Sequence, residues 1–186
     1  MRKLFAAGLL AALVGSASQA ALAAQRGGEL HYGRYADSLF LDPVLNDANV
    51  DIWILTNIYD TLLSPTSDGK GVEPGLATAW RLSDDGATLT LTLRDGVKFS
   101  DGTPLTPEDV KWSLDRARDP KNGIWNGLIG SIDQVGIEGQ NVVLKLKHPD
   151  PSIIPALATF NTAILPEKKF EAEPGATDAE KAKTFA

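Results

Sequence analysis

Hydrophobic and polar residues alternate without a break over residues 88–93, where leucines occupy one face and threonines the other. A period of two predicts a β-strand with one buried face. A second strand is predicted over residues 77–82, because residues 83–86, Ser-Asp-Asp-Gly, are a strong turn signal between the two segments. These residues therefore predict an antiparallel hairpin.

Further strand patterns lie on both sides of this hairpin. Residues 132–138 and 142–147 flank the turn-forming residues 139–141 and predict a second hairpin. Shorter patterns predict strands over residues 29–34 and 97–99. The middle of the chain is therefore expected to form a β-rich unit.

A helical pattern precedes the β-rich region. Over residues 50–63, Ile54, Ile58 and Leu62 recur at every fourth position. This spacing places them on one side of a helix and predicts a single apolar stripe. Ser64 and Pro65 follow directly and are expected to end the helix.

Two other helices have clear start signals. Thr106 is the predicted N-cap of the first, with Pro107 at the first helical position and Asp109 completing a capping box. Thr177 and Glu180 form the same pattern near the end of the chain. Helices are therefore expected to begin at residues 107 and 178.

The first residues have the composition of an export signal. Arg2 and Lys3 precede an apolar run over residues 4–14, which is shorter than the roughly 20 residues needed to cross a bilayer. An A-x-A cleavage pattern follows at residues 21–23. The sequence therefore predicts a signal peptide over residues 1–24. The sequence has no cysteine to carry a lipid, so the exported chain is not expected to be a lipoprotein.

Composition and charge argue against several classes of function. The 186 residues contain 18 Lys+Arg and 24 Asp+Glu, and a formal net charge of −6 argues against nucleic acid as a partner. Without cysteine, and with His31 and His148 far apart in sequence, no metal site is predicted. No phosphate loop or dinucleotide motif is present, so no cofactor is expected. After the signal, no apolar run approaches a membrane span.

Four tryptophans stand out in so short a chain. Trp53, Trp80 and Trp112 lie inside predicted elements and are expected to pack in the core. Trp125 lies in residues 121–127, a loop rich in turn formers. There it either packs at an edge of the core or lines a ligand pocket, and the residues alone leave both interpretations open.

Several motifs, taken in order, resemble family 5 of the bacterial extracellular solute-binding proteins. This is the dipeptide, oligopeptide and nickel class that feeds ABC importers. The motifs are Leu-Asp-Pro at 41–43, Ile-Tyr-Asp-Thr-Leu-Leu at 58–63, Pro-Gly-Leu-Ala-Thr-Ala-Trp at 74–80, Ser-Asp-Asp-Gly at 83–86, and the segment 93–110. The likeness begins near Glu29 and covers nearly all of the chain after the signal.

The resemblance implies a mixed α/β fold. Family members form a two-lobed clamshell of the type II periplasmic-binding-protein kind, with an extra small α+β domain on the first lobe. Residues 25–59 would begin the first lobe, residues 60–168 would form the extra domain, and residues 169–186 would return toward the first lobe. The second lobe would be absent, so the chain is expected to be a fragment or a truncated form that does not close on a ligand alone.

The resemblance also implies a function. The chain would belong to the substrate-binding component of an ABC importer, which captures a peptide or similar small solute in the periplasm. A permease in the inner membrane would be its partner, and it would be a monomer without catalytic activity. Asp47, Asn49 and Trp125 match the family's ligand-binding positions. Asp47 would accept from an ammonium group or N–H, Asn49 would donate and accept, and Trp125 would stack on the ligand.

Other interpretations stay open beside this one. Asp47 and Asn49 could form a solvated turn, with Asn49 as the N-cap of the next helix. The abundant carboxylates leave room for a secreted hydrolase that uses a carboxylate pair. A third possibility is an exported binding module with no role in transport.

Overall fold

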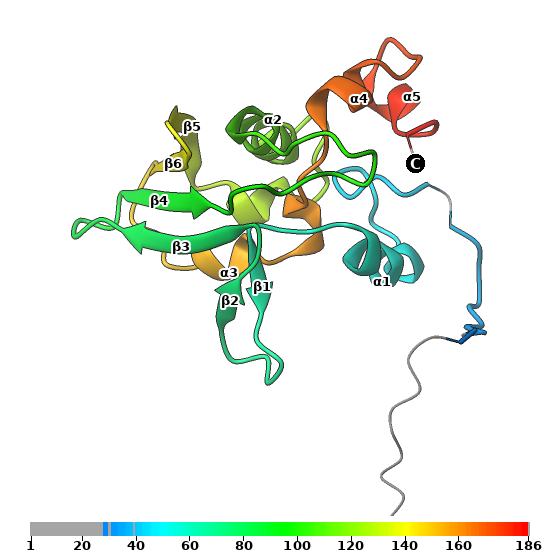
Figure 1. Cartoon of the computed structure of the whole chain (residues 1–186), viewed down its shortest axis with the longest axis horizontal. Coiled ribbons are helices and arrows are strands. Elements are labelled where there is room, and N and C mark those ends of the chain that lie inside the picture. The colour runs from blue at the N-terminus through cyan, green and yellow to red at the C-terminus, as the bar shows by residue number, and fades with distance from the viewer. Residues whose placement is uncertain (1–27, 30, 39, 186) are drawn as a thin grey trace, which may run out of the picture. The chain divides into compact units, whose positions relative to one another are not determined.

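The protein is described by a computed structural model that covers residues 28, 29, 31–38 and 40–185. The predicted signal peptide, residues 1–24, lies outside these residues. Residues 34–186 form one compact unit, to which the following description applies. Its centre is an antiparallel sheet of four strands in the order β3-β4-β6-β5 (Figure 1). The strands are β3 Ala77–Leu82, β4 Thr88–Leu93, β5 Ile132–Glu138 and β6 Asn141–Leu146.

The sheet follows directly from the alternating pattern. The leucines of β4 are buried, while its threonines lie on the more open face. β4 pairs with β3 on one side and β6 on the other, so Leu91 lies between Trp80 and Val142. Both predicted hairpins are confirmed, with β6 beginning one residue earlier than expected. Gly139 has φ 62°, a left-handed conformation that suits glycine in a tight turn.

Helix α2 covers the buried face of the sheet. It spans Pro107–Arg118 and lies against β5 and β6. The predicted capping box is confirmed, because the Thr106 hydroxyl accepts from the Asp109 N–H at 3.3 Å and Asp109 Oδ2 accepts from the Thr106 N–H at 2.9 Å. Its apolar residues Val110 and Leu114 are fully buried. Burial of this face stabilises both layers.

Shorter elements surround the sheet and α2 (Figure 1). A two-stranded ribbon and several single-turn helices were not predicted. These are β1 Leu63–Pro65, β2 Val72–Pro74, α3 Ile153–Ala156 and α4 Glu167–Glu171, with 3₁₀ turns at Asn126–Ile129 and Phe160–Thr162. The predicted helix near the end is confirmed as α5, Asp178–Lys181, with its capping box at Thr177.

The predicted helix over residues 50–63 is wrong at its end. Helix α1 spans Asn49–Ile58, and Tyr59 is already extended. Residues 60–65 instead pair with distant segments: the Asp60 carbonyl accepts from the Ile164 N–H at 3.0 Å, and the Leu62 carbonyl accepts from the Ala77 N–H at 2.9 Å. These long-range bonds overrode the local helical pattern.

The expected stripe on α1 is also wrong. The helix buries Asp51 and Leu55, whereas Ile58 is exposed and Trp53, which was expected in the core, is 66% exposed. The carboxylate of Asp51 is held by Arg34 and Asn46, so a buried polar contact sets the orientation of the helix. The regular spacing of apolar residues alone therefore did not identify the buried side of α1.

Two predicted strands are absent from the described residues. Residues 29 and 31–34 adopt no regular structure. In the 97–99 segment, a single bridge joins Lys98 to Pro104. Among the helices that the structure describes, none has both the length and the apolar character needed to cross a bilayer.

Buried apolar side chains form two clusters. The main core joins the sheet, α2 and α3, and takes nearly all of its members from residues 62–164. The second, here called the tail cluster, consists of Leu165, Phe170, Ala182 and Phe185 and packs against Leu45, Tyr59 and Trp112. The tail cluster includes Leu165 and Trp112 as well as residues outside 60–168, so the division at 59/60 and 168/169 stays a prediction.

Candidate functional site

Residues 42–49, here called the 42–49 loop, lead into α1 and include its first residue, and they carry two of the predicted ligand-binding residues. Asp42 begins the loop and folds it tightly. Its Oδ1 accepts from the N–H groups of Val44 at 2.9 Å and Leu45 at 3.0 Å. Pro43, which lies between Asp42 and Val44, restricts the backbone of the turn because its φ is fixed. The Leu-Asp-Pro sequence therefore forms a turn that its own carboxylate closes.

Asn46 holds the second half of the loop. Its Nδ2 donates to the Phe40 carbonyl at 2.6 Å and to Asp51 Oδ2 at 2.9 Å. Its Oδ1 accepts from the Ala48 N–H at 2.8 Å, and its own N–H donates to the Asp42 carbonyl at 3.2 Å. Only 2% of Asn46 is exposed. A buried amide with all these bonds made gives the loop one defined conformation.

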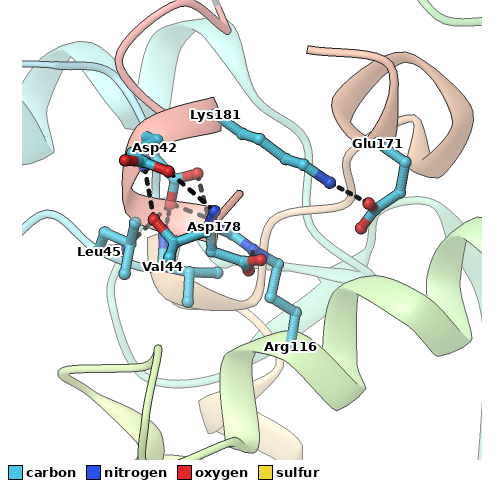
Figure 2. Close-up of polar contacts among 9 residues, drawn as sticks. Asp42, Val44, Leu45, Arg116, Glu171, Asp178 and Lys181 are labelled. Carbon is cyan, nitrogen blue, oxygen red and sulfur yellow. Dashed lines mark hydrogen bonds and ion pairs between the residues drawn. The ribbon is translucent and has the colours of Figure 1, made fainter. Parts of the chain in front are cut away.

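A buried arginine anchors the loop to α2. Figure 2 shows Arg116 reaching from α2 between Asp42 and Asp178. Its Nη1 and Nη2 contact Asp42 Oδ1 and Oδ2 at 3.1 and 2.9 Å, and its Nε donates to Asp178 at 2.5 Å. The guanidinium carbon lies 4.3 Å from the ring centre of Phe170. This charge cluster, Asp42, Arg116 and Asp178, joins the loop, α2 and α5; nearby, Lys181 pairs with Glu171.

Trp125 lies directly beside the 42–49 loop. Its indole Nε1 donates to the Asn46 carbonyl at 3.2 Å, and the Ile124 N–H donates to the Val44 carbonyl at 3.4 Å. Phe160 supports the indole in an edge-to-face contact at 6.0 Å. Gly123 lets the same loop lie against the end of α2, because a Cβ there would lie 2.2 Å from the Ala117 carbonyl oxygen.

The structure brings the three predicted residues into one region. Asp47 and Asn49 are exposed, and Trp125 is 37% exposed. The carbonyl that accepts from Trp125 belongs to the peptide bond preceding Asp47. The alternative for Asn49 is wrong, since the N-cap of α1 is Ala48 and Asn49 is already helical. Trp125 packs against Phe160 and the 42–49 loop, as the first interpretation expected, and its role in lining a ligand pocket stays a prediction.

Sequence reasoning missed the residues that support this site. Asn46 and Arg116 were not singled out, although both are almost fully buried. A signal for Arg116 was present: it follows Leu114 and precedes Ala117, so it is a charge close to the apolar face of α2. A charge in that position is typical of a buried ion pair.

A cavity of about 350 Å³ lies elsewhere in the same unit. Its walls include Leu41, Ile58, Phe99 and Phe185, and Lys169 is among its polar residues. None of the three predicted ligand-binding residues lines it. This cavity could not be predicted from the sequence, because it forms between segments that are far apart along the chain.

Tyr59, which also lines the cavity, couples stability to alkaline pH. Burial raises its pKa from 10.0 to about 12; the negative charge of Asp42 adds to this and Arg116 opposes it. Because the folded-state pKa is raised, its contribution to stability is complete below pH 10 and is lost as the pH rises toward 12. We expect the free energy of unfolding to fall less steeply over this range in Tyr59→Phe than in the wild type. Urea unfolding at pH 9 to 11.5 measures both slopes, and equal slopes would contradict the assignment.

The carboxylates of the charge cluster serve the structure. Asp42 is fully buried, and both it and Asp178 are paired with the same guanidinium. They therefore do not form an accessible acid–base pair. Within residues 28, 29, 31–38 and 40–185, no three His, Cys, Asp or Glu side chains gather as metal ligands would.

A family model for the middle region of the bacterial extracellular solute-binding proteins, family 5, matches residues 71–184. This is more than half of the chain. The chain belongs to this family. The resemblance seen in the motifs is thereby confirmed, and the family is described by solute binding and not by a reaction.

Two curated relatives from Escherichia coli K12 illustrate the family. The chain is 43% identical over 88 residues to the probable D,D-dipeptide-binding periplasmic protein DdpA, covering 45% of this chain and 17% of DdpA. It is 33% identical over 127 residues to the glutathione-binding protein GsiB, covering 67% of this chain and 25% of GsiB. The matched region thus spans a quarter or less of either relative.

A solved relative has the same fold. The binding protein AgaA from A. tumefaciens R10, in complex with agropinic acid, is 32% identical with a TM-score of 0.66. The match covers 74% of this chain and 28% of AgaA. The chain therefore has a mixed α/β fold that corresponds to part of a type II periplasmic binding protein, as the resemblance implied.

Proposed function

We propose that the chain provides part of the substrate-binding component of an ABC importer, which captures a peptide or similar small solute in the periplasm. Membership of family 5 and the periplasmic names of relatives such as DdpA support this proposal. The solute is bound and released unchanged, and the partner is a permease in the inner membrane. The chain acts as a monomer, exported by the predicted signal peptide.

The observation that carries the site assignment is the hydrogen bond between the Trp125 indole and the Asn46 carbonyl. It joins the loop around Trp125 to the 42–49 loop, although the two lie 79 positions apart in sequence. Asp47, Asn49 and Trp125 are then presented by buried, rigid supports. Groups held in this way bind a ligand with little loss of conformational entropy. We therefore assign these three residues to ligand binding.

Ligand-observed NMR with the mature chain tests this assignment. Trialanine, glutathione and D-alanyl-D-alanine serve as probes. We expect saturable binding of at least one probe with a Kd of about 1 mM, since a ligand on exposed residues keeps much of its contact with water. Asp47→Asn and Trp125→Ala should each weaken that binding at least about fivefold, which corresponds to about 1 kcal/mol.

Asp84→Asn is the matched control. Asp84 is also exposed, but it lies in the turn between β3 and β4. The Asp84→Asn variant should bind the probe with the affinity of the wild type. Equal loss in Asp84→Asn and Asp47→Asn would show a general charge effect and contradict the site. Absence of binding by every probe would contradict the proposed function itself.

A further inference from the structure

Four Asp-Gly pairs lie in exposed turns of the part of the chain that the structure describes. In each pair the glycine has a left-handed φ, between 68° and 87°. A glycine after an aspartate leaves its backbone nitrogen open to attack on the side-chain carboxyl carbon, because it has no Cβ to shield it. The four pairs share this sequence and this backbone conformation, so hydrogen bonding decides which of them can react. They are Asp68-Gly69, Asp85-Gly86, Asp95-Gly96 and Asp101-Gly102.

Three of the pairs hold both reacting groups in hydrogen bonds. In the pairs at 68, 85 and 101, the aspartate Oδ1 accepts from a hydroxyl and from a backbone N–H at 2.5–3.1 Å. The glycine N–H donates to the carbonyl three residues earlier at 2.8–2.9 Å. The hydroxyls of Thr66, Ser83 and Thr103 are also the main cause that holds the pKa of these three carboxyls below its usual range. This favours the carboxylate, which is less easily attacked than the acid.

Asp95-Gly96 differs from the other three pairs in both respects. Within residues 28, 29, 31–38 and 40–185, neither the Asp95 carboxylate nor the Gly96 N–H takes part in a hydrogen bond. Both residues are exposed, and a Cβ on Gly96 would meet no atom within 4 Å. The Gly96 nitrogen can therefore approach the carboxyl carbon without breaking a hydrogen bond or displacing a neighbour.

The two Asn-Gly pairs, which can form the same cyclic imide, are each held at one of the two groups. In Asn122-Gly123 the glycine N–H donates to the Asp119 carbonyl at 2.8 Å. In Asn126-Gly127 the asparagine Nδ2 donates to a backbone carbonyl. Neither Asn-Gly pair therefore leaves both reacting groups unbound.

The chain is fixed on both sides of the 95–96 pair. The Arg94 N–H donates to the Leu76 carbonyl at 2.8 Å, and the Val97 carbonyl accepts from the Leu105 N–H at 3.0 Å. Val97 packs against the main core and lines the cavity of about 350 Å³. A change in backbone length between Arg94 and Val97 would therefore displace a wall of the cavity.

We propose that Asp95 is a site of spontaneous isoaspartate formation. The Gly96 nitrogen attacks the Asp95 carboxyl carbon, and a new C–N bond forms as the carboxyl C–O bond breaks. The hydroxyl leaves with the nitrogen's proton as one water, which closes a cyclic imide. A solvent water then adds to the backbone carbonyl of position 95 and breaks its bond to the Gly96 nitrogen. The product keeps its mass and charge, but its backbone runs through the side chain and is one carbon longer.

Peptide mapping of the mature chain tests this proposal after incubation at about pH 5, where part of an ordinary aspartic acid is protonated. We expect isoaspartate to accumulate at Asp95 at least about tenfold faster than at Asp68, Asp85 or Asp101, because those three must first lose their hydrogen bonds. An isoaspartyl peptide keeps its mass, elutes separately and resists cleavage by endoproteinase Asp-N. Absence of isoaspartate at Asp95, or rates within about threefold of one another at all four sites, would overturn the proposal.

The unfolded chain is the control for local sequence. In concentrated guanidinium chloride at the same pH, the hydrogen bonds that distinguish the four pairs are lost. Their rates should then agree to within about threefold. If Asp95 reacts just as selectively in the unfolded chain, the flanking residues and not the fold select it, and the proposal fails.

Asp95→Asn gives a second test with a different readout. Asp95 makes no hydrogen bond, so the variant should melt at the temperature of the wild type by circular dichroism. At neutral pH an Asn-Gly pair forms the same imide with loss of ammonia, which changes the mass of the peptide. We expect deamidation at position 95 to be at least about tenfold faster than at Asn122 or Asn126, each of which has one reacting group bound. A rate at position 95 no greater than at either asparagine would contradict the proposal.

Discussion

Replacing Arg116 with methionine is expected to destabilise the protein by about 3–5 kcal/mol, because it removes the guanidinium that pairs with the fully buried carboxylate of Asp42 and leaves that charge uncompensated. Asp178 also loses its partner, and the ring contact with Phe170 is lost. Urea unfolding monitored by circular dichroism measures the change.

Arg81→Met is the matched control for this substitution. Arg81 is exposed on β3 and makes no ion pair among the described residues. Its replacement should change stability by less than about 0.5 kcal/mol. The double variant Asp42→Asn with Arg116→Met should lose less than the sum of the single variants, since it leaves no unpaired charge at the fully buried position 42. Strictly additive losses, or a loss below about 1 kcal/mol in Arg116→Met, would show that the charge cluster does not anchor the loop.

Replacing Phe170 with alanine is expected to cost a similar amount, about 3–5 kcal/mol. Phe170 is fully buried and packs against Trp112 and Phe185, with ring centres 5.2 and 5.1 Å apart. The lost ring leaves a void at the centre of the tail cluster. Hydrogen exchange should show that amides of residues 165–185 lose protection first, while β4 and β6 keep theirs.

Phe170→Leu and Phe99→Ala complete this experiment. The first retains most of the apolar volume and should cost no more than about 1.5 kcal/mol. The second removes a ring of the same size from a half-buried position on the main core, and should cost less than Phe170→Ala. A uniform loss of protection across sheet and tail in Phe170→Ala would argue that the two clusters unfold as one.

The sheet could be predicted from the sequence because local and tertiary preferences agree there. Thr88–Leu93 alternates, is flanked by turn residues, and buries its leucine face as the pattern requires. The start of α2 was equally predictable, since Thr106 and Asp109 satisfy each other's backbone groups within four residues. Signals of this kind need no knowledge of distant contacts.

Residues whose environment depends on distant segments were predicted poorly. Leu62 matched a helical period, but its carbonyl bonds to Ala77 and it belongs to the sheet side of the core. Trp53 was expected to be buried, yet α1 turns Asp51 inward because Arg34 and Asn46 satisfy its carboxylate. Single-sequence periodicity cannot identify such a partner in advance.

The candidate site shows the same division. The family resemblance supplied Asp47, Asn49 and Trp125, and the structure places Trp125 against the loop that carries the other two. The resemblance did not supply Asn46 or the paired state of Arg116. The paired state of Arg116 depends on contacts with residues more than 60 positions away in sequence. The role of Asn46 depends on hydrogen bonds that its side chain makes only when the loop is folded.

A two-dimensional ¹H–¹⁵N NMR titration of the mature chain with trialanine tests the central claim most directly, because it locates the ligand. The account predicts that the largest shift changes occur at the backbone amides of Asp47 and Asn49 and at the indole N–H of Trp125, and that all three follow one saturation curve. Changes confined to residues that line the 350 Å³ cavity, or no changes at saturating peptide, would contradict it.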